Sequence, residues 1–107
     1  MKRKNRIRKN TDFKKIIAKR NIKKNNEFVI YTDINKFGYA RFGYSVSSKI
    51  GNAVVRNRIK RQIRSMSNIL VNLDKNVDIV IIVRDGYKKN SYQQNLKSLK
   101  GLLQTLQ

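Results

Sequence analysis

The sequence contains no cysteine, histidine, proline or tryptophan, and only 6 of its 107 residues are acidic. Without cysteine the chain can form neither a disulfide nor a thiolate zinc site, and it has no thiol nucleophile. Without histidine it lacks the commonest general base of enzymes. No apolar run approaches the roughly 20 residues that a membrane span needs, and the basic start leads into no apolar core of a secretory signal. We therefore expect no catalytic residue, no bound cofactor or metal on the protein, and a cytoplasmic location.

Positive charge is what the chain has in excess. Its 26 Lys and Arg residues give a formal net charge of +20. Such a chain repels itself unless a polyanion neutralises it, and nucleic acid is the expected polyanion, with an anionic membrane surface as the rival. A hydrophobic content of 39% still supports one core, and the length suits a single domain. We expect one domain over residues 1–107, in which residues 1–9 form a mobile basic arm until RNA is bound.

Hydrophobic periodicity predicts an α/β fold, an α+β-type sandwich with the order α-β-β-α-β-α and a small mixed sheet. Helices are expected at about 12–20, 52–73 and 91–106, and strands at about 28–32, 39–47 and 77–83. The third strand is apolar except for Asp78, which predicts a central strand buried on both faces. The first two strands are expected to form a hairpin. In the second, alternation places Ala40, Phe42, Tyr44 and Val46 on one face and Arg41, Gly43, Ser45 and Ser47 on the other.

The helix expected at 52–73 has one apolar face. On a wheel of about 100° per residue, its apolar positions fall within a sector of about 80°. These positions are Val55, Ile59, Ile63, Met66, Leu70 and Leu73. Basic side chains spread over the rest of the surface, at Arg56, Arg58, Lys60, Arg61 and Arg64.

Two ordinary explanations compete with a binding role for this basic face. A solvated basic surface is the commonest reason for such a pattern, but no acidic residue occurs between positions 34 and 73 to pair with the cations. A helix lying on a membrane needs its apolar stripe free, whereas this stripe is required to cover the sheet. We therefore interpret the face as a phosphate-binding surface, because the arginine fork suits phosphate. The Gly51-Asn52 entrance can add free backbone N–H groups.

The segment 49–64 resembles the signature of the protein subunit of bacterial ribonuclease P. Its core is Arg56-Asn57-Arg58, with Gly51-Asn52 ahead of it and Lys60-Arg61 behind it. The resemblance extends in order over about residues 3–85, through the segments 4–7, 12–13, 28–31 and 43–47. Ile17 departs from the pattern, since the family often has a second aromatic residue there. Residues 84–86 depart as well, because the family is often richer there in basic residues and proline.

The resemblance implies a subunit that assists removal of the 5′ leader from precursor tRNA. Catalysis then belongs to a large RNA partner that uses Mg²⁺, and no protein partner is required. The resemblance also implies a left-handed β-α-β crossover, against a rule obeyed in about 98% of cases. It assigns contact with the RNA subunit to Lys49, Asn52, Arg56, Asn57, Arg58, Lys60, Arg61 and Arg64. It assigns a leader-binding cleft between the first helix and the sheet to Phe13, Lys14, Ile17 and Tyr31, with Lys15 as a further rim charge.

Alternatives remain open for the site and for the function. Phe13 and Ile17 could simply pack a helix onto the core, and Tyr31 fits a binding role if it points to the face opposite Ile30. A ribosomal or other structural RNA-binding protein would share the charge and the sandwich, and would co-purify with ribosomal subunits. A DNA-compacting protein would prefer duplex DNA over structured RNA.

Overall fold

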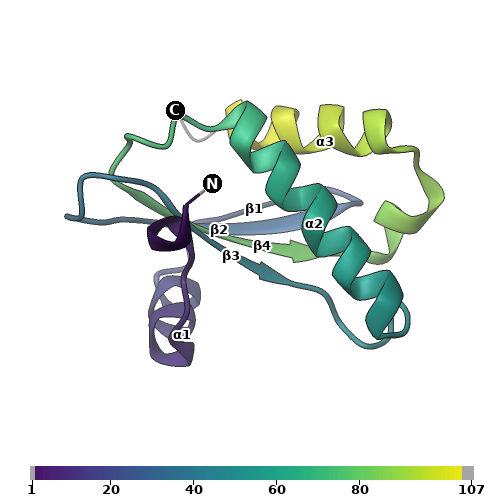
Figure 1. Ribbon diagram of the computed structural model, residues 1–107, viewed down its shortest axis with the longest axis horizontal. Coiled ribbons are helices and arrows are strands. Elements are labelled where there is room, and N and C mark those ends of the chain that lie inside the picture. The colour runs from purple at the N-terminus through teal and green to yellow at the C-terminus, as the bar shows by residue number, and fades with distance from the viewer. Residues whose placement is uncertain (1, 105–107) are drawn as a thin grey trace.

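Four strands form one mixed sheet in the computed structural model, which describes residues 2–104 (Figure 1). Helices α2 and α3 lie on one face of this sheet and α1 lies on the other. The elements are η1 (Arg3–Asn5), α1 (Asn10–Ala18), β1 (Ile22–Lys24), β2 (Phe28–Ile34), β3 (Arg41–Ser45), α2 (Ala53–Leu70), β4 (Val77–Val83), η2 (Asp85–Lys89) and α3 (Tyr92–Gln104). The predicted fold class is confirmed, with the short edge strand β1 as an addition that the sequence did not predict.

The strand order is β1-β2-β4-β3, so the predicted hairpin of β2 and β3 is wrong. β4 lies between them, antiparallel to β2 and parallel to β3. The loop that joins β2 to β3 instead bonds to the turn before β4. The Asn35 N–H donates to the Asn76 carbonyl at 3.1 Å, and the Ala40 N–H donates to the Leu73 carbonyl at 2.8 Å. β4 is therefore central, as its continuous apolar run predicts.

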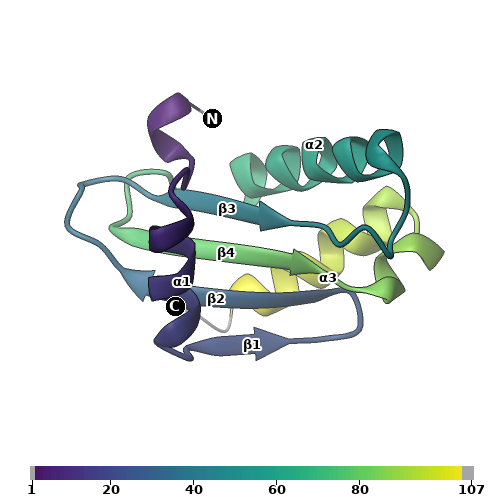
Figure 2. The ribbon, with the colours of Figure 1, turned by 90° about the horizontal axis from the view of Figure 1, so that it is seen from below.

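The connection from β3 through α2 to β4 is left-handed. Figure 2 views the sheet from below, with α2 behind it and β3 and β4 running in the same direction. With these strands turned to point upward, the chain moves from β3 to β4 toward the right through a helix behind the sheet. This is the hand opposite to the usual one, and it agrees with the expectation from the family resemblance.

The two faces of the sheet are covered to different extents. On the face under α2 and α3, called the closed face, the core contains Phe28, Ile30, Phe42, Ile79 and Ile81. On the face under α1, called the open face, a smaller cluster joins Ile7, Ile16 and Val80 to the half-buried Phe13, Tyr31 and Ile82. The alternation predicted for residues 40–47 is confirmed, because Phe42 lies in the closed-face core while Gly43 contacts the Phe13 ring on the open face.

Helix α2 is shorter than expected at its C-terminal end. Asn52 caps its start, since the Asn52 side-chain oxygen accepts a hydrogen bond from the Val55 N–H at 3.0 Å. The helix ends at Leu70 because Val71 adopts an extended backbone, and Leu73 lies in the following turn. Helix α1 begins at Asn10, before the predicted Asp12, and Arg20 beyond its end has a positive φ of 57°. Helix α3 begins at Tyr92, and the predicted end of this helix, at about residue 106, lies outside the described residues.

The N-terminal segment is anchored to the sheet at two residues. Asn5 is 2% exposed and its side-chain amide donates to the Ala40 carbonyl at 2.7 Å. Ile7 is 6% exposed and its N–H donates to the Phe42 carbonyl at 2.8 Å. Within the segment predicted to be a mobile basic arm, residues 1–9, these contacts attach Asn5 and Ile7 to the sheet. Mobility before RNA binding stays a prediction for the exposed charges around them.

Candidate nucleic-acid interface

The basic face of α2 points away from the sheet. Its apolar face is held in the core by Ile59, Ile63 and Met66, which are 3% exposed or less. The helical repeat then turns the charged positions outward, so Arg58 and Arg61 are exposed and Arg56, Lys60 and Arg64 are partly exposed. Lys49, Asn52 and Asn57 are exposed at and near the helix entrance. All eight residues assigned to the RNA subunit thus lie on α2 or in the turn before it.

No carboxylate within residues 2–104 pairs with these cations. The two ion pairs of this part of the chain both belong to Arg41, on β3. The Nε atoms of Arg56 and Arg64 are buried and have no hydrogen-bond partner among the described residues. Because buried polar donors are normally satisfied, these arginines have unused capacity for an anionic ligand. Asn52 differs from them, since its side-chain oxygen is used as the helix cap.

Tyr44 connects the edge of the sheet to the basic face of α2. Its ring stacks on Phe42 with 6.3 Å between ring centroids. Burial raises the pKa of Tyr44 to about 12, although a hydrogen bond with Ser67 of α2 and the charges of Arg64 and Arg6 act in the opposite direction. The phenol therefore stays neutral at physiological pH, and it lies close enough to Arg64 and Arg6 to interact electrostatically with them.

A groove of about 300 Å³ lies on the open face, beside α1. Its lining comprises Asn10, Phe13, Lys14, Ile17, Tyr44, Ser45, Val80 and Ile82. Phe13 can approach β3 closely because position 43 is glycine: a Cβ there would come within 2.4 Å of the Phe13 ring. Ile17 is 36% exposed and Phe13 is partly buried in the open-face cluster, so both side chains keep surface that faces the groove.

The structure brings three of the four predicted leader-binding residues together. Phe13, Lys14 and Ile17 line the groove, whereas Tyr31 and the predicted rim charge Lys15 do not. Tyr31 does point to the face opposite Ile30 and packs in the open-face cluster, where β2 pairs it with Val80 of the groove floor. Sequence reasoning missed Val80 and Ile82 as groove residues, although the apolar alternation of β4 already separates them from Ile79 and Ile81.

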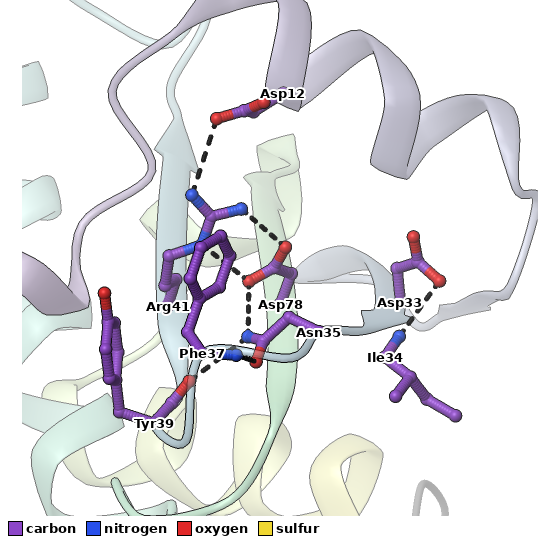
Figure 3. A network of polar contacts seen from close by, with 8 residues as sticks. All are labelled: Asp12, Asp33, Ile34, Asn35, Phe37, Tyr39, Arg41 and Asp78. Atoms are coloured by element: carbon purple, nitrogen blue, oxygen red, sulfur yellow. Dashed lines mark hydrogen bonds and ion pairs between the residues drawn. The ribbon is translucent and has the colours of Figure 1, made fainter.

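A polar network fixes α1 over the open face (Figure 3). Arg41 donates to both carboxylate oxygens of Asp78, at 2.8 and 2.7 Å, and to Asp12 of α1 at 3.4 Å. Asn35 donates to the same Asp78 carboxylate at 2.8 Å. The hydrogen bonds that Arg41 donates to Asp78 are the main cause that raises the pKa of Arg41 above its ordinary value. Asp78, 5% exposed, is thus a buried structural partner of Arg41.

The remaining chemistry of the described residues is sparse. No group of three or more histidine, cysteine or carboxylate side chains lies together within residues 2–104 in a way that could hold a metal ion. No helix in that part of the chain is long and apolar enough to cross a membrane. The described surface therefore offers cations, aromatic rings and a groove, which are the means of binding nucleic acid.

Comparisons with known proteins agree with one another. The family model described as Ribonuclease P matches residues 1–107. A ribonuclease P protein component from Mesoplasma florum is 48% identical over 105 residues, covering 96% of both chains. One from Bacillus mycoides is 46% identical over 101 residues, covering 92% of this chain and 88% of the relative. The solved RNase P protein of Staphylococcus aureus superposes with a TM-score of 0.85 at 37% identity, covering 96% of this chain and 95% of the other. That of Thermotoga maritima gives 0.84 at 28% identity, covering 95% and 97%.

Proposed function

This chain belongs to the ribonuclease P protein family, and we propose that its basic helix binds the RNA subunit while its open-face groove binds the 5′ leader. The chain acts as the protein component of ribonuclease P, which forms the 5′ end of tRNA. A ribosomal role is not favoured, because the relatives that match over most of the chain are ribonuclease P components. We place its action in the cytoplasm, where bacterial precursor tRNA is made.

One observation supports the proposal: a basic helix face and a groove with an aromatic ring lie on opposite sides of the sheet. The α2 surface has five cations without an acidic partner in the described chain, so it suits the dense phosphates of a folded RNA. The groove under α1 has an aromatic ring, apolar floor residues and the rim charge Lys14. Stacking rings beside basic charge suit a single strand of varied sequence. The protein can therefore hold both RNAs at once.

We further propose that the chemistry belongs to the RNA subunit with Mg²⁺. The described residues bring together no set of side chains suited to acid–base or two-metal hydrolysis. The contribution of the protein is then binding: it neutralises RNA phosphates and positions the leader. Because added positive charge substitutes in part for metal ions in screening phosphates, the protein should lower the Mg²⁺ concentration that cleavage requires.

The test is reconstitution with the cognate RNA subunit and a precursor tRNA at low Mg²⁺. We expect no cleavage by the protein alone, little by the RNA alone, and restored cleavage by the two together. Cleavage by repurified RNA-free protein would overturn the assignment of the chemistry to RNA. Failure of the protein to stimulate its RNA subunit at any Mg²⁺ concentration would overturn the proposed function.

The groove is tested separately, with Phe13→Ala. This variant should weaken holoenzyme binding to precursor tRNA with a long leader. It should leave unchanged both the binding of mature tRNA, which has no leader, and the affinity of the protein for the RNA subunit. Loss of stacking on one base lowers affinity by about 1–3 kcal/mol. Lys19→Ala, beyond the end of α1 and outside the groove, is the control. Equal weakening for mature tRNA would exclude a leader-specific groove.

A further inference from the structure

A second hollow lies beside β3, where the N-terminal segment crosses the sheet. It has a volume of about 370 Å³ and is lined by five cations and one ring: Arg3, Lys4, Arg6, Arg8, Arg41 and Tyr39. None of these residues lines the open-face groove or lies on α2. The hollow is therefore separate from both surfaces of the proposed function.

The backbone holds these cations in place. Asn5 and Ile7 are buried anchors, bonded to the carbonyls of Ala40 and Phe42 at 2.7 and 2.8 Å. Arg6 forms an isolated parallel bridge with Phe42. Arg6 lies between the buried Asn5 and Ile7, and Arg8 directly follows Ile7. Both arginines therefore project from a backbone segment that is attached to the sheet. Their backbone positions are thus fixed before a ligand arrives, which reduces the entropy lost on binding.

A chain of ring contacts borders the hollow. The Arg41 guanidinium lies 4.4 Å from the centre of the Phe37 ring, and Phe37 stacks on Tyr39 with 5.7 Å between centroids (Figure 3). The Lys4 ammonium lies 4.7 Å from the centre of the Tyr39 ring. Lysine is a flexible and strongly hydrated partner for a ring. A nucleobase can replace it, because every base has a flat face for stacking.

Charge at the hollow is not balanced within the described chain. Arg41 is paired with Asp78 and Asp12, whereas Arg3, Lys4, Arg6 and Arg8 have no ion pair within residues 2–104. Four uncompensated cations around one tyrosine favour a ligand that carries both phosphate and a flat ring. A bare anion would leave the ring unused, and an apolar molecule would leave the charges unused.

We propose that this hollow binds one unpaired nucleotide of RNA, with its base on the Tyr39 ring and its flanking phosphates between Arg3, Arg6 and Arg8. The nucleotide can come from the RNA subunit or from the precursor tRNA. Both sources present the same chemistry, and two binding measurements distinguish them. One measures affinity of the protein for the RNA subunit, and the other measures affinity of the assembled holoenzyme for precursor tRNA.

The first test replaces the ring. Tyr39→Leu removes the stacking surface and should weaken one of the two affinities by about 5- to 150-fold. Tyr39→Phe retains the ring and should bind almost as the original protein does. Tyr39→Phe is therefore the matched control for the loss of the ring. Melting curves of all variants accompany the binding curves, so that loss of fold is separated from loss of contact.

The second test removes charge. The double variant Arg3→Gln, Arg8→Gln should make the slope of log affinity against log salt shallower by about 1 to 2 units in the same measurement. Lys97→Gln with Lys100→Gln removes the same charge from the exposed side of α3 and should leave that slope closer to the original. If the double arginine variant reduces this slope while Tyr39→Leu binds normally, the hollow binds phosphate but no base. That result would overturn the nucleotide site.

A direct measurement needs no variant. Thiouridine-labelled RNA subunit and labelled precursor tRNA are each irradiated with the original protein, and crosslinked peptides are mapped. A crosslink to Tyr39 or its neighbours in one RNA supports the proposal, and crosslinks to neither RNA overturn it. Cleavage by the unaltered holoenzyme reports on the proposed function independently. An active holoenzyme without Tyr39 contacts refutes this inference alone.

Discussion

The closed and open faces of the same sheet differ in how much helix covers them. On the closed face, α2 with 18 residues and α3 with 13 cover a continuous apolar core. On the open face, α1 has 9 residues and covers only part of the sheet, which leaves the groove beside Phe13. The two faces of one sheet therefore differ in role: the closed face carries most of the apolar core, and the open face leaves apolar surface uncovered beside α1.

The open face compensates for its thin cover with polar contacts. Asp78 and Arg41, with side chains 7% and 14% exposed, join β4 to β3, and Asp12 extends the pair to α1. Apolar burial positions α2 and α3, whereas this charged pair helps to position α1. Substitutions on the two faces should therefore have different consequences for stability and for RNA binding.

The largest loss of stability is expected for Asp78→Ala. It leaves the Arg41 guanidinium buried without its bidentate partner, and breaking such a pair costs about 3–5 kcal/mol. Asp33→Ala is the matched control, because Asp33 is the direct neighbour of Asp78 on β2 and its carboxylate accepts from the adjacent Ile34 N–H. That change should cost about 1 kcal/mol or less. Chemical denaturation measures both, and equal losses would show that the network does not hold α1.

The next effect compares one isoleucine from each face. Ile59→Ala removes a side chain that is 3% exposed in the closed-face core, and it should lower the free energy of unfolding by about 2–5 kcal/mol. Ile17→Ala, where the side chain is 36% exposed in the groove, should lower it by about 1 kcal/mol or less. The same Ile17 variant should weaken binding of leader-bearing precursor tRNA. A reversed order of the two stability losses would contradict the assignment of tasks to the faces.

Substitutions on the outer side of α2 should weaken RNA binding and leave the stability of the protein nearly unchanged. Arg58 and Arg61 are exposed and lie away from the core, so replacing both with Ala should leave the thermal midpoint nearly unchanged. Affinity for the RNA subunit should fall, and the slope of log affinity against log salt should become shallower by about 1 to 2 units if both contact phosphates. Normal binding at every salt concentration would identify this part of the helix as merely solvated.

The smallest expected effect is on the unfolding free energy at alkaline pH, through Tyr87 in the closed-face core. Burial raises the pKa of Tyr87 to about 12, so the folded protein keeps this phenol neutral after the unfolded chain has begun to ionise it. The resulting stability is complete below pH 10 and is lost as the pH rises toward about 12. Tyr87→Phe should therefore flatten the decline of the unfolding free energy over this range, beside a small constant loss from its hydrogen bond to Gln62. Identical slopes for both proteins would refute the effect.

Hydrophobic periodicity alone predicts the strongly patterned elements and the surface that they expose. The apolar positions of α2 lie within one sector, so its cations had to point outward wherever the helix packed. The continuous apolar run of β4 required burial on both faces, and alternation in β3 separated Phe42 from Gly43. The segment around Arg56-Asn57-Arg58 identified the family before any contact was known.

Which segments meet could not be predicted from local patterns and is seen only in the assembled fold. β2 pairs with β4 across almost half of the chain, and the hairpin expected from sequence proximity does not form, because local patterning specifies which face of a strand is buried and not which strand lies beside it. The same holds for the anchoring of Asn5 and Ile7, for Arg41 between Asp78 and Asp12, and for Val80 under Phe13. Each depends on contacts between residues distant in sequence, whose energies exist only once the sheet has assembled.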